Sequence, residues 1–150
     1  MNYKGKITTH FSWEELIQNQ DNYTVEWTKQ RHDDFELLLE MLEEFRTWVG
    51  RSMSIHGCIR TSAYNAKVKG NAKSNHLNFR AVDFHIDGID FGEKFVKYAT
   101  KWKNICEKHG VVGEAGLYTW GFHFGFQTYS KTFYNWDSRS GTQKNMAFKI

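Results

Sequence analysis

Apolar residues recur at three- and four-residue steps in two long segments of the chain, and this spacing predicts two amphipathic helices. The first covers about 33–49 and is followed by Gly50, a residue type that commonly ends helices. The second starts after Asp90 and stops at Gly110. A short helix over 12–17 opens with Ser-Trp-Glu-Glu, a sequence typical of a capping box.

Four shorter segments are predicted to be strands, because they are mostly apolar or alternate apolar with polar residues. They are 54–59, 81–86, 111–118 and 122–126, with a turn near 119–121. Helices therefore come first, and a small antiparallel sheet dominates the second half of the chain. This order predicts an α+β fold with N-terminal helices.

The length of 150 residues suits a single domain over 1–150 that ends in a loosely structured tail over 138–150. Aromatic residues make up 17% of the chain, which supplies a core and excludes a mainly disordered protein. The formal net charge of +3 comes from scattered residues, so nucleic-acid binding is not expected. The protein is expected to be a monomer. No apolar run approaches the roughly 18–20 residues of a membrane span, so membrane insertion is not expected.

The start of the chain and its cysteines indicate a cytoplasmic origin. The first residues are polar, so no signal peptide is predicted. Cys58 and Cys106 are too few for a disulfide framework, and both are expected to be free thiols.

Three residues stand out as candidate metal ligands. His76 lies in a polar turn before the strand that contains Asp83, and His123 lies within an apolar strand. A carboxylate on such a strand is costly unless it is paired or bound to a cation. Two imidazoles and one carboxylate are a common ligand set for catalytic zinc with an open fourth position. On spacing alone, a hydrogen-bonded Asp–His pair in the core remains the alternative.

The other histidines are interpreted as structural or surface residues. Three lie in polar surroundings or near helix ends: His10, His32 and His109. His85 shares a strand face with Asp83, so it either approaches the metal or is a buried, hydrogen-bonded histidine. We expect the second role for His85 and also for His56, on the neighbouring strand.

The sequence around the candidate ligands resembles the zinc peptidases of the D-alanyl-D-alanine carboxypeptidase and phage L-alanyl-D-glutamate endolysin family. The family pattern runs Ser-Gly-Tyr-Arg-Ser-x-x-x-Asn, a Gly-containing turn, and then Ser-x-His-x-x-Gly-x-Ala-x-Asp. Seven residues of this chain fall on that pattern in register: Arg60, Asn65, Gly70, Ser74, His76, Ala81 and Asp83. The segments 10–16 and 113–122 resemble the family's opening and its last strand pair, so the likeness covers about 10–126.

This resemblance implies a hedgehog/DD-peptidase-like fold in which His76, Asp83 and His123 hold Zn²⁺ on the sheet. It places Arg60 where the family has an arginine that contacts the substrate or the developing oxyanion, a role that suits a fixed guanidinium. The alternative for Arg60 is a surface ion pair. The implied substrate is a peptide of peptidoglycan.

Several positions depart from the family pattern. Phe79 replaces a glycine, so the approach to the following strand is expected to differ. Gly125 stands where one branch is often acidic, and Trp120 stands near the usual place of the general base. The nearest upstream carboxylate is Glu114, and a hairpin could bring it to the metal as the base. The alternative for Glu114 is a solvated strand carboxylate.

The leading interpretation is a zinc peptidase that hydrolyses peptidoglycan stem peptides, as a phage or prophage lytic enzyme. It would be made in the cytoplasm of the producing host and act on the wall after release, or act as part of a phage particle. The alternative is a catalytically impaired zinc-binding, wall-binding or phage structural protein on the same fold. A non-haem iron oxygenase is a third and weaker candidate, because two histidines and one carboxylate also describe that site.

Overall fold

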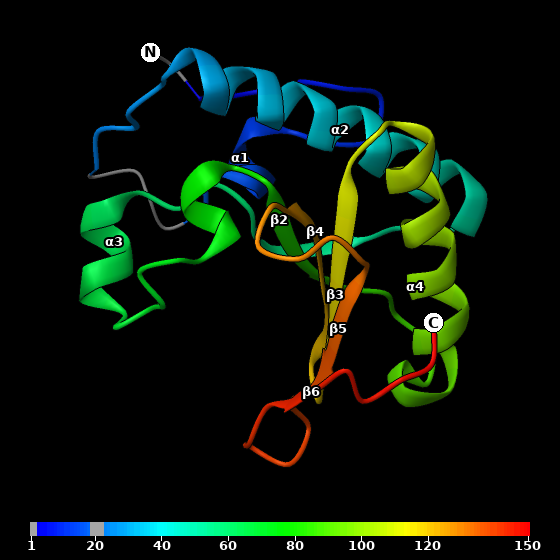
Figure 1. The fold of residues 1–150 in the computed structure, drawn as a ribbon. Coiled ribbons are helices and arrows are strands. Elements are labelled where there is room, and N and C mark those ends of the chain that lie inside the picture. The colour runs from blue at the N-terminus through cyan, green and yellow to red at the C-terminus, as the bar shows by residue number, and fades with distance from the viewer. Residues whose placement is uncertain (1–2, 19–22) are drawn as a thin grey trace.

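The computed structural model describes residues 3–18 and 23–150, with the elements arranged as in Figure 1. The helical elements are α1 (Trp13–Leu16), α2 (Lys29–Val49), α3 (Ser62–Lys67), the 3-10 helix η1 (Asn75–Asn78) and α4 (Phe91–Lys108). The strands are β1 (Ser54–Gly57), β2 (Ala81–His85), β3 (Val112–Tyr118), β4 (Gly121–Gln127), β5 (Tyr134–Asp137) and β6 (Lys144–Asn145). All the predicted helices and strands are present, whereas α3, η1, β5 and β6 were not predicted.

The described strands form one sheet with the order β1-β2-β4-β3-β5-β6. Neighbouring strands are antiparallel except for β3 and β5, which run parallel. The α+β class is confirmed, and the sheet is mostly antiparallel as predicted. The parallel pair arises because the chain returns after β4 to lie on the far side of β3.

Local signals set the helix ends. Ser12 and Glu15 form the predicted capping box at the start of α1. Helix α2 begins earlier than predicted because Thr28 caps it and its first turn is polar, without apolar periodicity. It ends at Gly50, whose φ of 65° is the left-handed conformation that glycine adopts easily.

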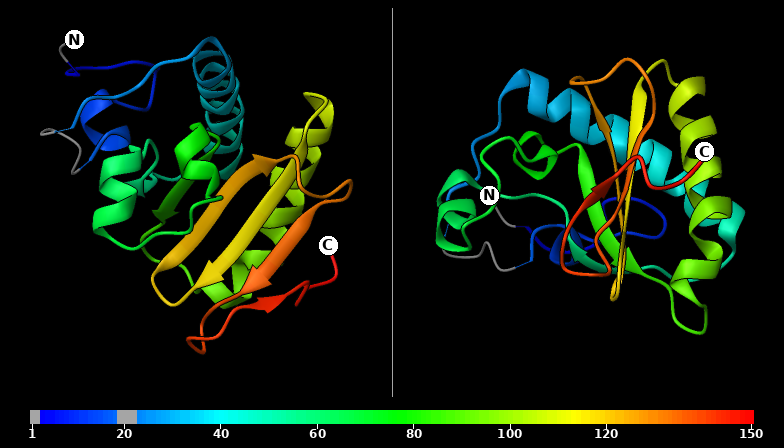
Figure 2. Two further views of the ribbon diagram at one scale, coloured as in Figure 1. Left: turned by 60° about the vertical axis from the view of Figure 1, so that its left-hand side comes forward. Right: turned by 60° about the horizontal axis from the view of Figure 1, so that its bottom comes forward.

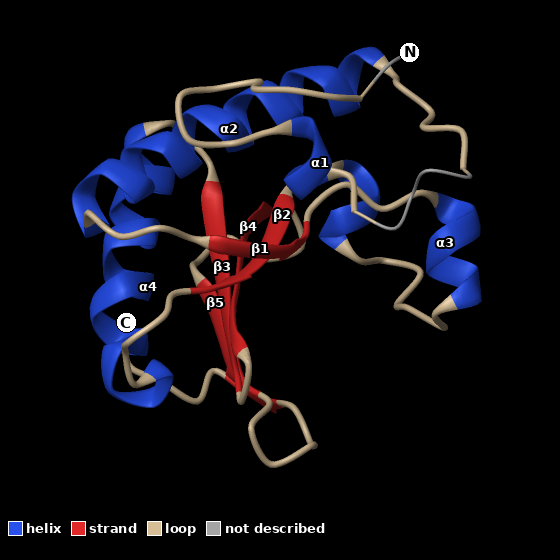
Figure 3. Cartoon of the chain, turned by 180° about the vertical axis from the view of Figure 1, so that it is seen from behind, coloured by secondary structure: helices blue, strands red, loops and turns tan. Residues whose placement is uncertain are grey.

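One face of the sheet is covered by helices. In the left view of Figure 2 the strands lie in front of α4, and Figure 3 shows α2 crossing beside them. Phe124 of β4 lies 5.3 Å from Phe45 of α2 and 5.5 Å from Trp102 of α4, measured between ring centroids. Each such ring, when fully buried, contributes about 1.5–3 kcal/mol. This face therefore supplies the main hydrophobic core.

The opposite face of the sheet carries a row of polar and aromatic positions. Asp83 of β2 pairs with His123 of β4, which pairs with Gly116 of β3, which pairs with Trp136 of β5. A Cβ on Gly116 would lie 2.3 Å from the Trp136 indole, so glycine is needed for the indole to lie across β3. The centroid of the indole is consequently 5.1 Å from that of the His123 ring.

The segment 138–150 consists mostly of turns and contains one short strand. It adds β6 to the sheet edge, and the Asn135 side chain then anchors it. The Asn135 amide donates to the carbonyl of Phe148 at 3.0 Å and accepts from the Phe148 N–H at 2.9 Å. These pairings are non-local, which is why local periodicity did not reveal them. None of the described helices is long and apolar enough to cross a membrane.

Candidate metal centre

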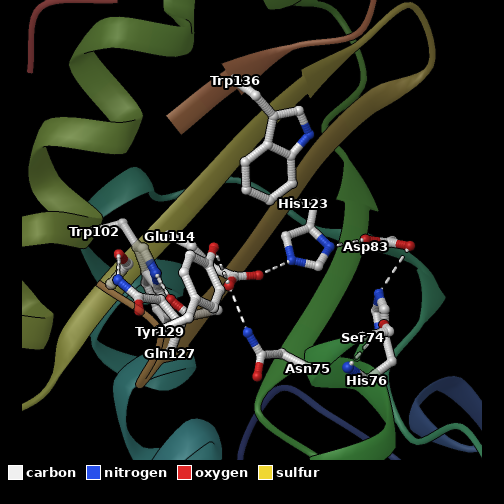
Figure 4. Close-up of polar contacts among 12 residues, drawn as sticks. Ser74, Asn75, His76, Asp83, Trp102, Glu114, His123, Gln127, Tyr129 and Trp136 are labelled. Carbon is white, nitrogen blue, oxygen red and sulfur yellow. Dashed lines mark hydrogen bonds and ion pairs between the residues drawn. The ribbon is translucent and has the colours of Figure 1, made fainter. Parts of the chain in front are cut away.

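The structure brings together the three candidate ligands that the sequence predicted (Figure 4). His76 Nε2 lies 3.1 Å from Asp83 Oδ2, and His123 Nδ1 lies 2.8 Å from Asp83 Oδ1. One possible ligand atom from each residue lies within 4.8 Å of the others. The three side chains come from η1, β2 and β4, so the sheet and the turn before it assemble the group.

The backbone around η1 holds His76. Ser74 caps this turn by accepting a hydrogen bond from the His76 N–H at 3.3 Å. His76 Nδ1 lies 2.9 Å from the carbonyl oxygen of Cys58, so Nδ1 carries the proton and Nε2 presents its lone pair. In the part of the chain that the structure describes, the buried Nε2 has no hydrogen-bond partner of acceptable geometry.

This orphaned nitrogen is the test of whether the residues fit a metal. A lone pair that faces a carboxylate is unfavourable unless a proton or a cation lies between them. His76 Nε2 and the Asp83 carboxylate are in this relation, and His123 adds a second imidazole beside them. Two nitrogen donors and one carboxylate suit zinc, so the residues present fit a divalent metal.

Charge compensation within the group is strong. Burial raises the pKa of Asp83, but the neighbouring His76 and His123 outweigh burial and hold that pKa well below its usual range. Burial lowers the pKa of His123, but Glu114 and Asp83 outweigh burial and raise it well above its usual range. The Asp83 carboxylate therefore requires a positive charge beside it, and a metal cation would supply that charge in place of the His123 proton.

The structure gives a physical account of Phe79. Its φ of 60° is the left-handed conformation that a glycine adopts without cost, so the backbone geometry expected of a glycine is retained here by a larger residue. The Phe79 ring is buried, and its centroid lies 5.0 Å from that of the Trp27 ring. Packing of the ring therefore offsets the backbone strain, which is of order 1–3 kcal/mol for such a residue.

Glu114 reaches His123 through the β3–β4 hairpin, as the sequence suggested, but it lies on the far side of the ring from Asp83 (Figure 4). Its Oε2 contacts His123 Nε2, whereas Asp83 contacts Nδ1. Its Oε1 accepts hydrogen bonds from Asn75 Nδ2 at 2.6 Å and from the Tyr129 hydroxyl at 3.0 Å. Glu114 is 3% exposed, so it is not a solvated strand carboxylate.

Arg60 lines the same cleft as the candidate ligands. This open cleft has a volume of about 710 Å³, and Tyr118, Tyr134 and Trp136 line it opposite. Arg60 Nη1 donates to Asn65 Oδ1 at 3.3 Å, and none of the described carboxylates forms an ion pair with it. The Asn65 side-chain amide therefore positions the guanidinium, and the guanidinium is available to bind an anionic group of a ligand.

Sequence reasoning missed the residues that support the ligands from outside. Asn75 and Tyr129 hold Glu114, and Trp136 lies against His123. Asn75 was visible as the neighbour of His76, but no local signal places Tyr129 or Trp136, because both reach the site through the fold.

Histidines outside this group differ in their surroundings. His10 lies 2.6 Å from Glu43, and His109 lies 2.7 Å from Glu44. His32 belongs to an exposed group with two acidic residues of α2. His56 and His85 contact each other instead, at 2.6 Å between Nε2 and Nδ1. Burial and the nearby His85 lower the pKa of His56.

The fold and the site define an α+β protein with a candidate metal centre of two histidines and one aspartate. The family model for Peptidase M15 matches residues 9–118, and the chain belongs to that family of metallopeptidases. The family is zinc-dependent, and His76, Asp83 and His123 are a group that could bind the metal.

One solved structure similar to this chain is the L-Ala D-Glu endopeptidase ChiX of Serratia marcescens. It is 14% identical, with a TM-score of 0.45 over 74% of this chain and 95% of the ChiX chain. No curated protein matches the chain.

Proposed function

We propose that this protein is a zinc peptidase that hydrolyses stem peptides of peptidoglycan, as the lytic enzyme of a phage or prophage. The observation that carries the proposal is the buried Nε2 of His76, which lies 3.1 Å from the Asp83 carboxylate and makes no hydrogen bond of acceptable geometry among the described residues, with His123 completing a group of three candidate ligands. Membership of the Peptidase M15 family supports the same chemistry. The substrate class rests on the sequence resemblance to wall-cleaving peptidases.

His76 Nε2, an Asp83 oxygen and His123 Nδ1 would hold the metal. Bound zinc polarises a carbonyl and lowers the pKa of its water to about 7. The protein orients its ligands through the outer partners of the imidazoles, namely the Cys58 carbonyl for His76 and Glu114 for His123. Arg60, free of carboxylate partners among the described residues, would stabilise negative charge on the substrate.

The proposed role of Glu114 follows from its position. A general base must reach the proton that it removes, but Glu114 contacts the His123 nitrogen that points away from Asp83. This geometry favours a positioning role, in which Glu114 accepts a hydrogen bond from the His123 Nε2–H and thereby directs the Nδ1 lone pair to the metal. The general-base role predicted from the sequence stays a proposal, because Asp83 and Glu114 are the only carboxylates among the described residues that line the cleft.

The second candidate function is a zinc-binding, wall-binding protein without turnover. It is favoured by one observation, the full engagement of Glu114 with three donors: His123, Asn75 and Tyr129. Three of the roughly four acceptor positions of the carboxylate are then occupied, which leaves Glu114 little capacity to accept a proton from water.

Digestion of purified peptidoglycan, followed by mass spectrometry of the muropeptides, tests the proposal. The zinc-loaded protein should release peptide fragments of defined mass, and these fragments identify the bond that is cut. Asp83→Ala should release none, whereas His32→Ala, altered in an exposed group, should match the parent protein. A parent protein that binds zinc and sediments with peptidoglycan but releases nothing would establish the second candidate instead.

A further inference from the structure

We propose that His56 and His85 form a second site for a divalent transition-metal ion, separate from the group of His76, Asp83 and His123. Neither histidine belongs to that first group. The proposal therefore stands or falls independently of the peptidase function.

The two imidazoles face each other with their nitrogens. His56 Nε2 lies 2.6 Å from His85 Nδ1, and the ring centroids are 4.8 Å apart. The two rings come from paired strands: Ser54 of β1 lies opposite His85 of β2, and His56 lies at the register shift between Ile55 and Gly57. Adjacent ligands of one ion, each about 2.0–2.1 Å from it, lie slightly farther apart than these nitrogens do. A small rotation of the exposed His56 ring would therefore admit an ion.

A carboxylate holds the far nitrogen of the His85 ring, as it does in many metal sites. His85 Nε2 lies 3.0 Å from Asp87 Oδ1, so Nε2 donates its proton to the carboxylate. The lone pair of His85 is then on Nδ1, the nitrogen that faces His56. A carboxylate on the far nitrogen of a ligating histidine fixes the ring and raises its basicity.

Both rings are open to solvent, so water molecules could supply the remaining ligands of the ion. His56 is exposed and the His85 side chain is 28% exposed, so an ion could reach both rings from solvent. Trp120 lies beside His56, with 5.2 Å between ring centroids, and limits the directions that the His56 ring can take. Two imidazoles without a thiolate suit Zn²⁺, Ni²⁺ or Cu²⁺ rather than a hard ion such as Mg²⁺.

Equilibrium dialysis against Zn²⁺ or Ni²⁺, followed by elemental analysis, tests the proposal. The parent protein should bind two equivalents, and the double variant His56→Gln/His85→Gln should bind one. Asp83→Ala should also bind one, because it keeps the second site while losing the first. A parent protein that saturates at one equivalent, with Asp83→Ala binding none, would overturn the proposal and leave the first site intact.

Site identity is checked by NMR of the imidazole nitrogens in protein whose first site is already loaded with zinc. Added Zn²⁺ should shift the signals of His56 Nε2 and His85 Nδ1, and should leave the exposed His32 unshifted. Shifts of His32 without shifts of His56 would contradict the proposal. Retention of the first equivalent and of the circular dichroism spectrum shows that the double variant is folded.

Discussion

The two faces of one strand, β4, show how differently this sheet is stabilised on its two sides. Phe122, Phe124 and Phe126 point into the helical layer and are buried. His123 and Gln127 alternate with them on the opposite face, where they are held by hydrogen bonds. The apolar face is stabilised mainly by the area removed from water. The polar face depends on charges that balance one another, so the loss of one leaves another buried and unpaired.

Substituting Asp83 should have the largest effect on the polar face. Asp83→Ala removes the carboxylate shared by His76 and His123, so we expect it to lose the zinc equivalent of this first site and all peptidoglycan cleavage. Elemental analysis after dialysis measures this loss, with His32→Ala as the control. Stoichiometric zinc retained at the first site by Asp83→Ala would contradict the ligand assignment.

The opposite result is expected from the apolar face. Phe124→Ala leaves a cavity between Phe45 and Trp102, and should lower the free energy of unfolding by about 3–5 kcal/mol. Denaturant unfolding measures the loss. The protein that remains folded should keep its zinc, since Phe124 does not face the ligands. Zinc affinity that falls as far as in Asp83→Ala would show that the two faces are coupled.

Glu114→Gln separates the two roles proposed for this residue. A positioning role predicts zinc affinity weaker by about 10–100-fold, because the His123 proton loses its charged acceptor. The general-base role predicts unchanged zinc affinity and turnover lower by about 10²–10⁴-fold. Competition with a chromogenic chelator measures affinity, and muropeptide release at saturating zinc measures turnover. If neither the zinc affinity nor the turnover changes, both roles are excluded.

The smallest effect is expected from the cysteines. Cys58 and Cys106 are free and buried, and burial raises the pKa of both thiols. Both should react slowly with a thiol reagent in the folded protein, and two thiols should appear after denaturation. A single reactive thiol, or none, after denaturation without reductant would contradict this.

The sequence was most informative where local periodicity and composition decide structure. Helices α2 and α4 and strands β2, β3 and β4 were predictable because their apolar residues repeat with the period of the element. Strand β5 was missed because it is short and pairs with β3 through a return of the chain that no local pattern encodes. Helix α3 and β6 are shorter than the windows in which periodicity can be recognised.

The candidate site also has features that the sequence predicts and features that only the fold determines. His76, Asp83 and His123 could be named from a motif, because residue type and spacing are written in the sequence. The nitrogen of His123 that faces Asp83 could not be inferred, because it depends on the register of β2, β3 and β4. That register is what changes the role favoured for Glu114.

The indole of Trp136, laid across Gly116, gives the protein an intrinsic optical reporter of its own site. An imidazolium quenches the fluorescence of a neighbouring indole more strongly than a neutral imidazole does, and His123 is in ring contact with Trp136. Replacement of the His123 proton by zinc should therefore change the emission of this one tryptophan. Because Gly116 alone permits that contact, Gly116→Ala should silence the signal by displacing the indole. Metal loading could thus be followed in real time without any added dye.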